Sequence, residues 1–128
     1  MKKWFIFAAL LVVVALGASA SVATGGNAKK RRAQMKFDQP VTLQGVVLKG
    51  EYLFVHDDAA MARGEACTYV YKGQAEIPGK LVVSFHCTPA ARDKVKSFTV
   101  RTELLGGVTQ LQEFQFAGET ESHIVPAR

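Results

Sequence analysis

The sequence predicts an all-β fold: a single small antiparallel sandwich or partly open barrel of about six strands in three hairpins, with two short connecting helices. Six short runs, rich in Val, Phe, Tyr and Thr, alternate apolar with polar residues, as half-buried strands do. Glycine-containing turns separate the two runs of each pair. Setting aside the first 20 of the 128 residues leaves 108, enough for one small domain with a modest core.

The first twenty residues have the features of an export signal. Two lysines precede the apolar run WFIFAALLVVVALG, and the small residues ASA at 18–20 suit a cleavage site. The run is short for a transmembrane helix, which needs about 20 residues. We therefore predict a bacterial signal peptide over 1–20 and a periplasmic or extracellular protein. The alternative is an uncleaved N-terminal segment that anchors the protein to the membrane.

Residues 21–36, SVATGGNAKKRRAQMK, predict a flexible basic arm, because they are small and polar and lack an apolar period. Of the 16 basic residues in the chain, seven precede Phe37, and the 9 that follow face all 11 acidic ones. The β domain predicted over 37–128 is thus mildly acidic, and the net charge of +5 does not indicate nucleic-acid binding. We expect a solvated tether, or alternatively a weak contact with an anionic membrane surface, through Lys29, Lys30, Arg31 and Arg32.

The three predicted hairpins follow the arm in order. The first has strands over 41–48 and 51–56, joined by a turn at Lys49-Gly50. The middle one has strands over 67–72 and 81–87, joined by the loop GQAEIPG. The third has strands over 97–104 and 111–116, joined by a turn at Gly106-Gly107.

Helices are predicted in the two connections between hairpins. In DDAAMARG, Asp57 or Asp58 can cap the first turn and Gly64 can end the helix. In TPAARDKVKS, Thr88 is a candidate N-cap and Pro89 suits the first helical position. The segment AGETESHIVPAR follows the last hairpin as a tail.

Two segments, LKGEYLFVHD and EFQFAGETESHIVP, resemble pieces of small uncharacterised exported β proteins of bacteria. The resemblance implies export and β structure. It implies no activity and no site residues.

The two cysteines lie in the middle hairpin. The more apolar face of each strand carries the odd-numbered residues, and opposed residues of an antiparallel pair share a face. A loop centred near Ile77 satisfies this parity by pairing Tyr69 with Phe85 and Cys67 with Cys87. In an exported chain this arrangement predicts a Cys67–Cys87 disulfide. Buried free thiols, or thiolates held by a metal, are the alternatives.

No catalytic motif is present: the sequence has no GxSxG, HExxH, CxxC or phosphate-binding glycine loop. Neighbouring residues on a strand point to opposite faces, so His86 cannot deprotonate Cys87. The sequence therefore predicts a protein that is not an enzyme and needs no cofactor.

Two functional hypotheses remain. The first is a non-catalytic binding or structural module of the bacterial cell envelope, whose ligand or protein partner the sequence does not identify. The second is a periplasmic copper or zinc protein, because imidazole and thioether groups suit these metals. Its candidate ligands are His56, His86 and His123, with Met61 nearby in sequence. Their spacing matches no short metal-binding motif.

Overall fold

The computed structural model describes residues 29–127, so the predicted signal peptide and the start of the predicted arm lie outside the described residues. The described chain is mostly strand. Its elements are β1 (Lys30–Leu43), β2 (Val46–Asp57), α2 (Asp58–Ala62), β3 (Thr68–Lys72), the 3-10 helix η1 (Pro78–Lys80), β4 (Leu81–Phe85), β5 (Thr88–Ala91), β6 (Thr99–Leu105), β7 (Val108–Gln115) and β8 (Glu121–Ile124).

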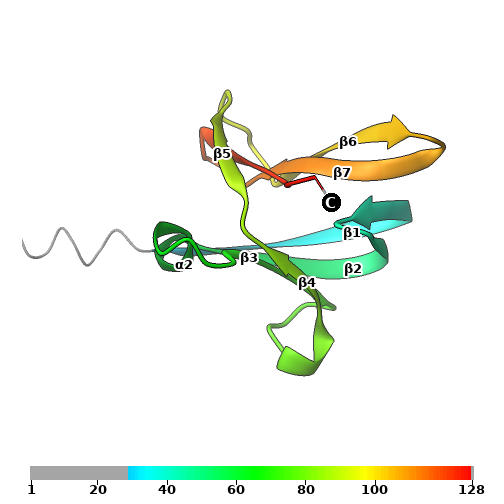
Figure 1. The fold of residues 1–128 in the computed structure, drawn as a ribbon, viewed down its shortest axis with the longest axis horizontal. Coiled ribbons are helices and arrows are strands. Elements are labelled where there is room, and N and C mark those ends of the chain that lie inside the picture. The colour runs from blue at the N-terminus through cyan, green and yellow to red at the C-terminus, as the bar shows by residue number, and fades with distance from the viewer. Residues whose placement is uncertain (1–28, 128) are drawn as a thin grey trace, which may run out of the picture.

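The strands form one mixed sheet that curls into a half-barrel. Its order is β4-β3-β2-β1-β7-β8-β5, and β6 pairs with β7 beside this path. β1 and β7 run parallel, whereas every other described pair is antiparallel. Figure 1 shows β1–β4 on one side of the molecule and β6 and β7 on the other. The all-β prediction is confirmed. The prediction of about six antiparallel strands is wrong, because the sheet is mixed and has eight strands.

The first hairpin is longer than predicted and turns elsewhere. Its two-residue turn is Gln44-Gly45, whose φ values of 50° and 80° are both positive, as a type I′ turn requires. The predicted turn glycine, Gly50, instead lies within β2 with φ 96°, beside an irregularity in the β1–β2 register. The flexible arm is wrong for residues 30–36, which form the first half of β1 and pair with β2.

The middle hairpin is confirmed, but its predicted register is wrong. Thr68 pairs with Phe85 and Val70 with Val83, so the cysteines are not directly opposed. The core face of β3 carries Thr68 and Val70, which are buried, while the tyrosines are only half-buried. The neighbouring strand explains this choice, because Val70 lies opposite the buried Phe54 of β2.

The first predicted helix is confirmed as α2. The Asp57 carboxylate accepts hydrogen bonds from the backbone N–H groups of Ala59 and Ala60, and Gly64 follows with φ 78°.

The second predicted helix is wrong. Residues 88–91 form β5, which pairs with β8 in the predicted tail. β5 ends the strand order, where Pro89 can be tolerated because an edge strand needs fewer backbone donors. The third hairpin is confirmed around Gly106-Gly107.

An aromatic core fills the inside of the curled sheet. The ring centroid of Phe114 lies 5.6 Å from the ring centroid of Phe54 and 5.9 Å from that of Phe116. In the described part of the chain, no helix has the length and apolar character needed to cross a membrane.

Candidate metal site

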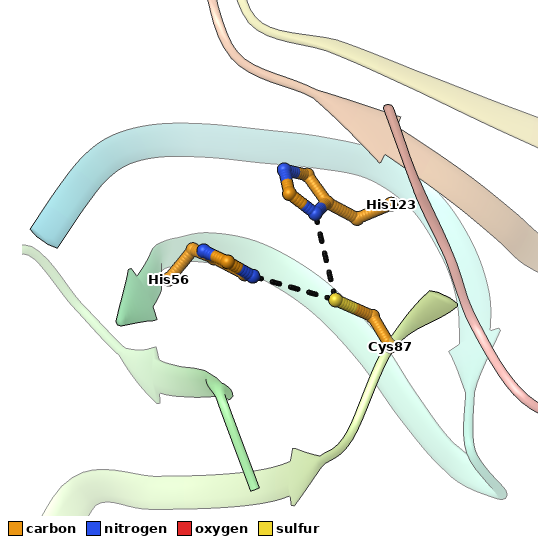
Figure 2. A group of neighbouring side chains, drawn as sticks. All are labelled: His56, Cys87 and His123. Atoms are coloured by element: carbon orange, nitrogen blue, oxygen red, sulfur yellow. Dashed lines mark hydrogen bonds between the residues drawn. The ribbon is translucent and has the colours of Figure 1, made fainter. Parts of the chain in front are cut away.

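Three fully buried side chains converge beside this aromatic core: His56, Cys87 and His123, none more than 1% exposed. Figure 2 shows both imidazole rings turned toward the sulfur of Cys87. The Cys87 Sγ lies 3.4 Å from His56 Nε2 and 3.5 Å from His123 Nδ1. All three ligand atoms lie within 4.8 Å of one another. We call this group the His–Cys–His cluster.

The two nitrogen–sulfur distances in the cluster match those between ligands around one metal ion. An ion at about 2.0–2.1 Å from an imidazole nitrogen and about 2.3 Å from a thiolate, at a tetrahedral angle, sets the two ligand atoms about 3.5–3.6 Å apart. The observed nitrogen–sulfur distances of 3.4 and 3.5 Å differ from this by a tenth or two of an ångström. Both distances are therefore compatible with coordination of one ion.

The cluster forms where the curled sheet nearly closes. β4 and β5 stand at opposite ends of the strand order, yet only His86 and Cys87 separate them in the chain. Figure 1 shows the chain passing from β4 on one side to β5 on the other. Cys87 is thus held at the joint, while His56 comes from β2 and His123 from β8. Three distant segments must fold together before the cluster exists.

Hydrogen bonding orients the His56 ring. Its Nδ1 lies 3.1 Å from Asp58 Oδ1, which also accepts a hydrogen bond from Arg31 at 2.8 Å. Because a carboxylate only accepts, the ring donates its Nδ1–H there, which leaves the Nε2 lone pair facing the cluster. A carboxylate behind a histidine is the usual outer partner of a metal-binding imidazole.

Aromatic packing orients the His123 ring. Its centroid lies 5.1 Å from Phe114 in a stacked arrangement and 5.9 Å from Phe116 at the ring edge. The His56 ring lies 4.1 Å away on a tilted plane. These contacts hold the Nδ1 atom toward Cys87 in a largely apolar shell.

Burial keeps the cluster neutral. Burial lowers the pKa of His56, although the Asp58 carboxylate opposes the shift. Burial and the neighbouring His56 and Arg31 lower the pKa of His123 to about 3. Burial and the adjacent Cys67 thiol raise the pKa of Cys87 to about 12. Both imidazoles are therefore in the form that binds metals, and the thiol must lose its proton on binding.

The predicted disulfide is wrong: Cys67 and Cys87 are free thiols. Their Sγ atoms lie 3.4 Å apart, whereas a disulfide bond is about 2.05 Å long. The observed strand register explains the difference, since the two residues are not a directly opposed pair. Cys67 contacts Cys87 but does not belong to the His–Cys–His cluster.

Two of the three predicted metal ligands come together. His56 and His123 join the cluster, but the exposed His86 instead places its Nδ1 2.9 Å from the backbone oxygen of Glu65. Met61, also considered from the sequence, packs against the apolar core. From the sequence, metal-held thiolates are only an alternative, because the disulfide prediction assigns the Cys87 sulfur to Cys67. The opposite orientations of His86 and Cys87 already favoured the cysteine as the inward residue.

The predicted basic arm contributes side chains to the folded domain. Arg31 forms ion pairs with Asp58 and Glu119, and Lys30 and Arg32 both pair with Glu76. Lys29 contributes its backbone oxygen, which accepts from the Asp58 N–H at 2.9 Å.

No protein-family model matches the sequence, and searches of curated proteins and of solved structures likewise return no match.

Proposed function

We propose that this protein binds one copper or zinc ion through His56 Nε2, Cys87 Sγ and His123 Nδ1. The observation that carries the proposal is the convergence of these three buried atoms within 4.8 Å. Imidazole and thiolate ligands together suit copper and zinc better than magnesium or calcium, which prefer oxygen.

The packing of the cluster supports a metal over a purely structural role. Burying the polar imidazole and thiol groups is unfavourable unless they form good hydrogen bonds. A thiol is a weak hydrogen-bond donor, so its contacts with the imidazoles at 3.4 and 3.5 Å offset little of that unfavourable free energy. A metal ion bound between the two imidazoles and the thiolate would coordinate all three groups strongly. Asp58 behind His56 supplies the outer support that such ligands use.

We further propose that the protein is a non-catalytic component of the bacterial cell envelope. The lysines, apolar run and ASA site within residues 1–20 support export. N-terminal sequencing of the protein from a fractionated host tests this part separately. A mature chain that begins after Ala20, in the periplasm or medium, is expected.

Metal content tests the binding proposal directly. The untagged protein, reduced and purified without chelator, is incubated with copper or zinc, desalted and measured by elemental analysis. We expect one ion per chain in the wild type and loss of that ion in Cys87→Ser and His123→Gln, since each removes a ligand. Circular dichroism establishes that the variants remain folded.

His86→Gln is the matched control, because it removes a histidine that is adjacent in sequence but points away from the cluster. It is expected to retain the ion. A folded wild type that binds neither metal, or ligand variants that bind as well as the wild type, would contradict the proposal.

A further inference from the structure

We infer that the resident ion is monovalent copper, Cu(I), held by one thiolate and two imidazoles, with Cys67 beside it but outside the ligand set. This inference rests on the proposed function and narrows it to one metal and one set of sulfur ligands.

The number of ligands favours Cu(I). The cluster supplies three atoms, and no further His, Cys, Asp or Glu among residues 29–127 joins the set. Structural zinc sites almost always have four protein ligands, and catalytic ones add a water to three. Copper(I) is a soft ion that thiolates select, and three-coordinate geometry is common for it. With ligands no more than 1% exposed, the cluster offers a bound ion little access to a solvent ligand.

Charge points the same way. Cu(I) with one thiolate and two neutral imidazoles is neutral overall, whereas zinc with the same ligands leaves one positive charge in a buried site. An uncompensated buried charge is costly. The charged groups that act on His56 are Asp58, Arg31 and Asp57. Asp58 pairs with Arg31 at 2.8 Å, and the Asp57 carboxylate accepts hydrogen bonds from the backbone N–H groups that begin α2. Both carboxylates are therefore already engaged by other groups.

The presence of Cys67 beside Cys87 favours Cu(I) over both zinc and Cu(II) as the bound ion. Cys67 Sγ lies 3.4 Å from Cys87 Sγ, yet Cys67 is not one of the three residues whose ligand atoms converge. A zinc site with two thiolates would require Cys67 to move into the ligand set. Cu(II) would be unstable there: one Cu(II) at the site and a second from solution would take one electron each from the two thiols, giving two Cu(I), two protons and a sulfur–sulfur bond.

A competition experiment under anaerobic, reducing conditions tests the inference on the full chain. Cu(I) is titrated against a chromophoric Cu(I) chelator, and zinc in parallel against a zinc indicator. We expect one Cu(I) per chain, bound more tightly than zinc. Cys87→Ser should weaken Cu(I) binding by more than about 100-fold, beyond the loss typical of an outer partner. Cys67→Ser should weaken it by no more than about 10-fold, at the lower end of that range.

X-ray absorption on the copper-loaded protein counts the sulfur ligands, a readout independent of affinity. One sulfur and two nitrogens at the copper are expected, in both the wild type and Cys67→Ser. Tighter binding of zinc, or two sulfurs at the metal with equal losses in both cysteine variants, would overturn the inference while leaving the proposed function standing. If the folded, reduced protein binds neither ion, the proposed function itself fails.

Discussion

His56 has a polar partner on each side of its ring. Asp58 receives the Nδ1–H at 3.1 Å, and Cys87 lies 3.4 Å from Nε2. The carboxylate thereby fixes which nitrogen carries the proton and which is free for a metal. In the described part of the chain, Asp58 forms a hydrogen bond with His56 but with neither Cys87 nor His123, although its charge also acts on His123.

Asp58→Asn is expected to weaken metal binding by about 10–100-fold, the loss typical for an outer partner of a metal ligand. An amide can present its NH₂ to the ring and so no longer specifies the tautomer. Glu119→Gln is the control, because it alters the other carboxylate paired with Arg31 and leaves the Asp58–His56 bond intact. Equal losses in the two variants, measured by metal competition, would show that the effect is one of overall charge.

The cluster shows what sequence can and cannot predict about single residues. His56 and His123 are candidates from their chemistry alone, because imidazole groups suit copper and zinc. The assignment of Cys87 depended on a strand register, and a shift of one position changes which residues are opposed. His86 matched the other histidines in chemistry, but only the fold shows that its ring contacts the Glu65 backbone.

At the scale of elements, β2 depends on a glycine in its interior. Gly50 has φ 96°, in a region that residues with a side chain rarely adopt, and a Cβ there would meet no atom within 4 Å. Its requirement is therefore one of backbone conformation alone.

Gly50→Ala is expected to lower the free energy of unfolding by about 1–2 kcal/mol, the cost of a left-handed backbone for an alanine. Gly79→Ala is the matched control, because it also has open space and no positive φ. Chemical denaturation of the two variants against the wild type makes the comparison. If Gly50→Ala were as stable as Gly79→Ala, the inference that position 50 requires a backbone conformation unfavourable for alanine would be wrong.

Local signals predicted the elements that they specify. Gly106-Gly107 marked the third hairpin, and the Asp57 cap marked α2. The first half of β1 was missed because its residues are basic and polar, and they pair with a strand whose register the local sequence does not give. β5 and β8 are four residues each and depend on one another across a long separation, so neither shows a clear period.

At the scale of the whole molecule, an ionic network centred on the buried Glu113 joins β6, β7, β8 and the residue after β5. Glu113 of β7 accepts hydrogen bonds from Arg101 of β6, Ser122 of β8 and Arg92, just beyond β5. Burial opposes ionisation of Glu113, but its hydrogen bonds from Arg92 and Ser122 and the charges of Arg92 and Arg101 outweigh burial and lower its pKa below 4.5.

This network predicts a pH-dependent contribution to stability. A carboxylate whose pKa is lower in the folded state stabilises the protein above its unfolded pKa and loses this effect as pH falls through the folded value. In metal-free protein at pH 7, Glu113→Gln should reduce the free energy of unfolding by about 1–3 kcal/mol. The difference from wild type should shrink in acid.

Glu103→Gln provides the control, because Glu103 is exposed on β6 and its loss should change stability by less than about 0.5 kcal/mol. Urea denaturation at several pH values gives both curves. A Glu113→Gln deficit that stays constant from neutral to acidic pH would rule out the carboxylate charge as its source.

The proposed metal site lies at the connection between β4 and β5, where residues from β2 and β8 also meet. The most direct measurement is an anomalous difference map from crystals of copper- or zinc-loaded protein, collected at the absorption edge of the metal. We predict a single peak at about 2.0–2.3 Å from His56 Nε2, Cys87 Sγ and His123 Nδ1. A peak at His86 instead, or an empty cluster in protein exposed to both metals, would contradict the proposal.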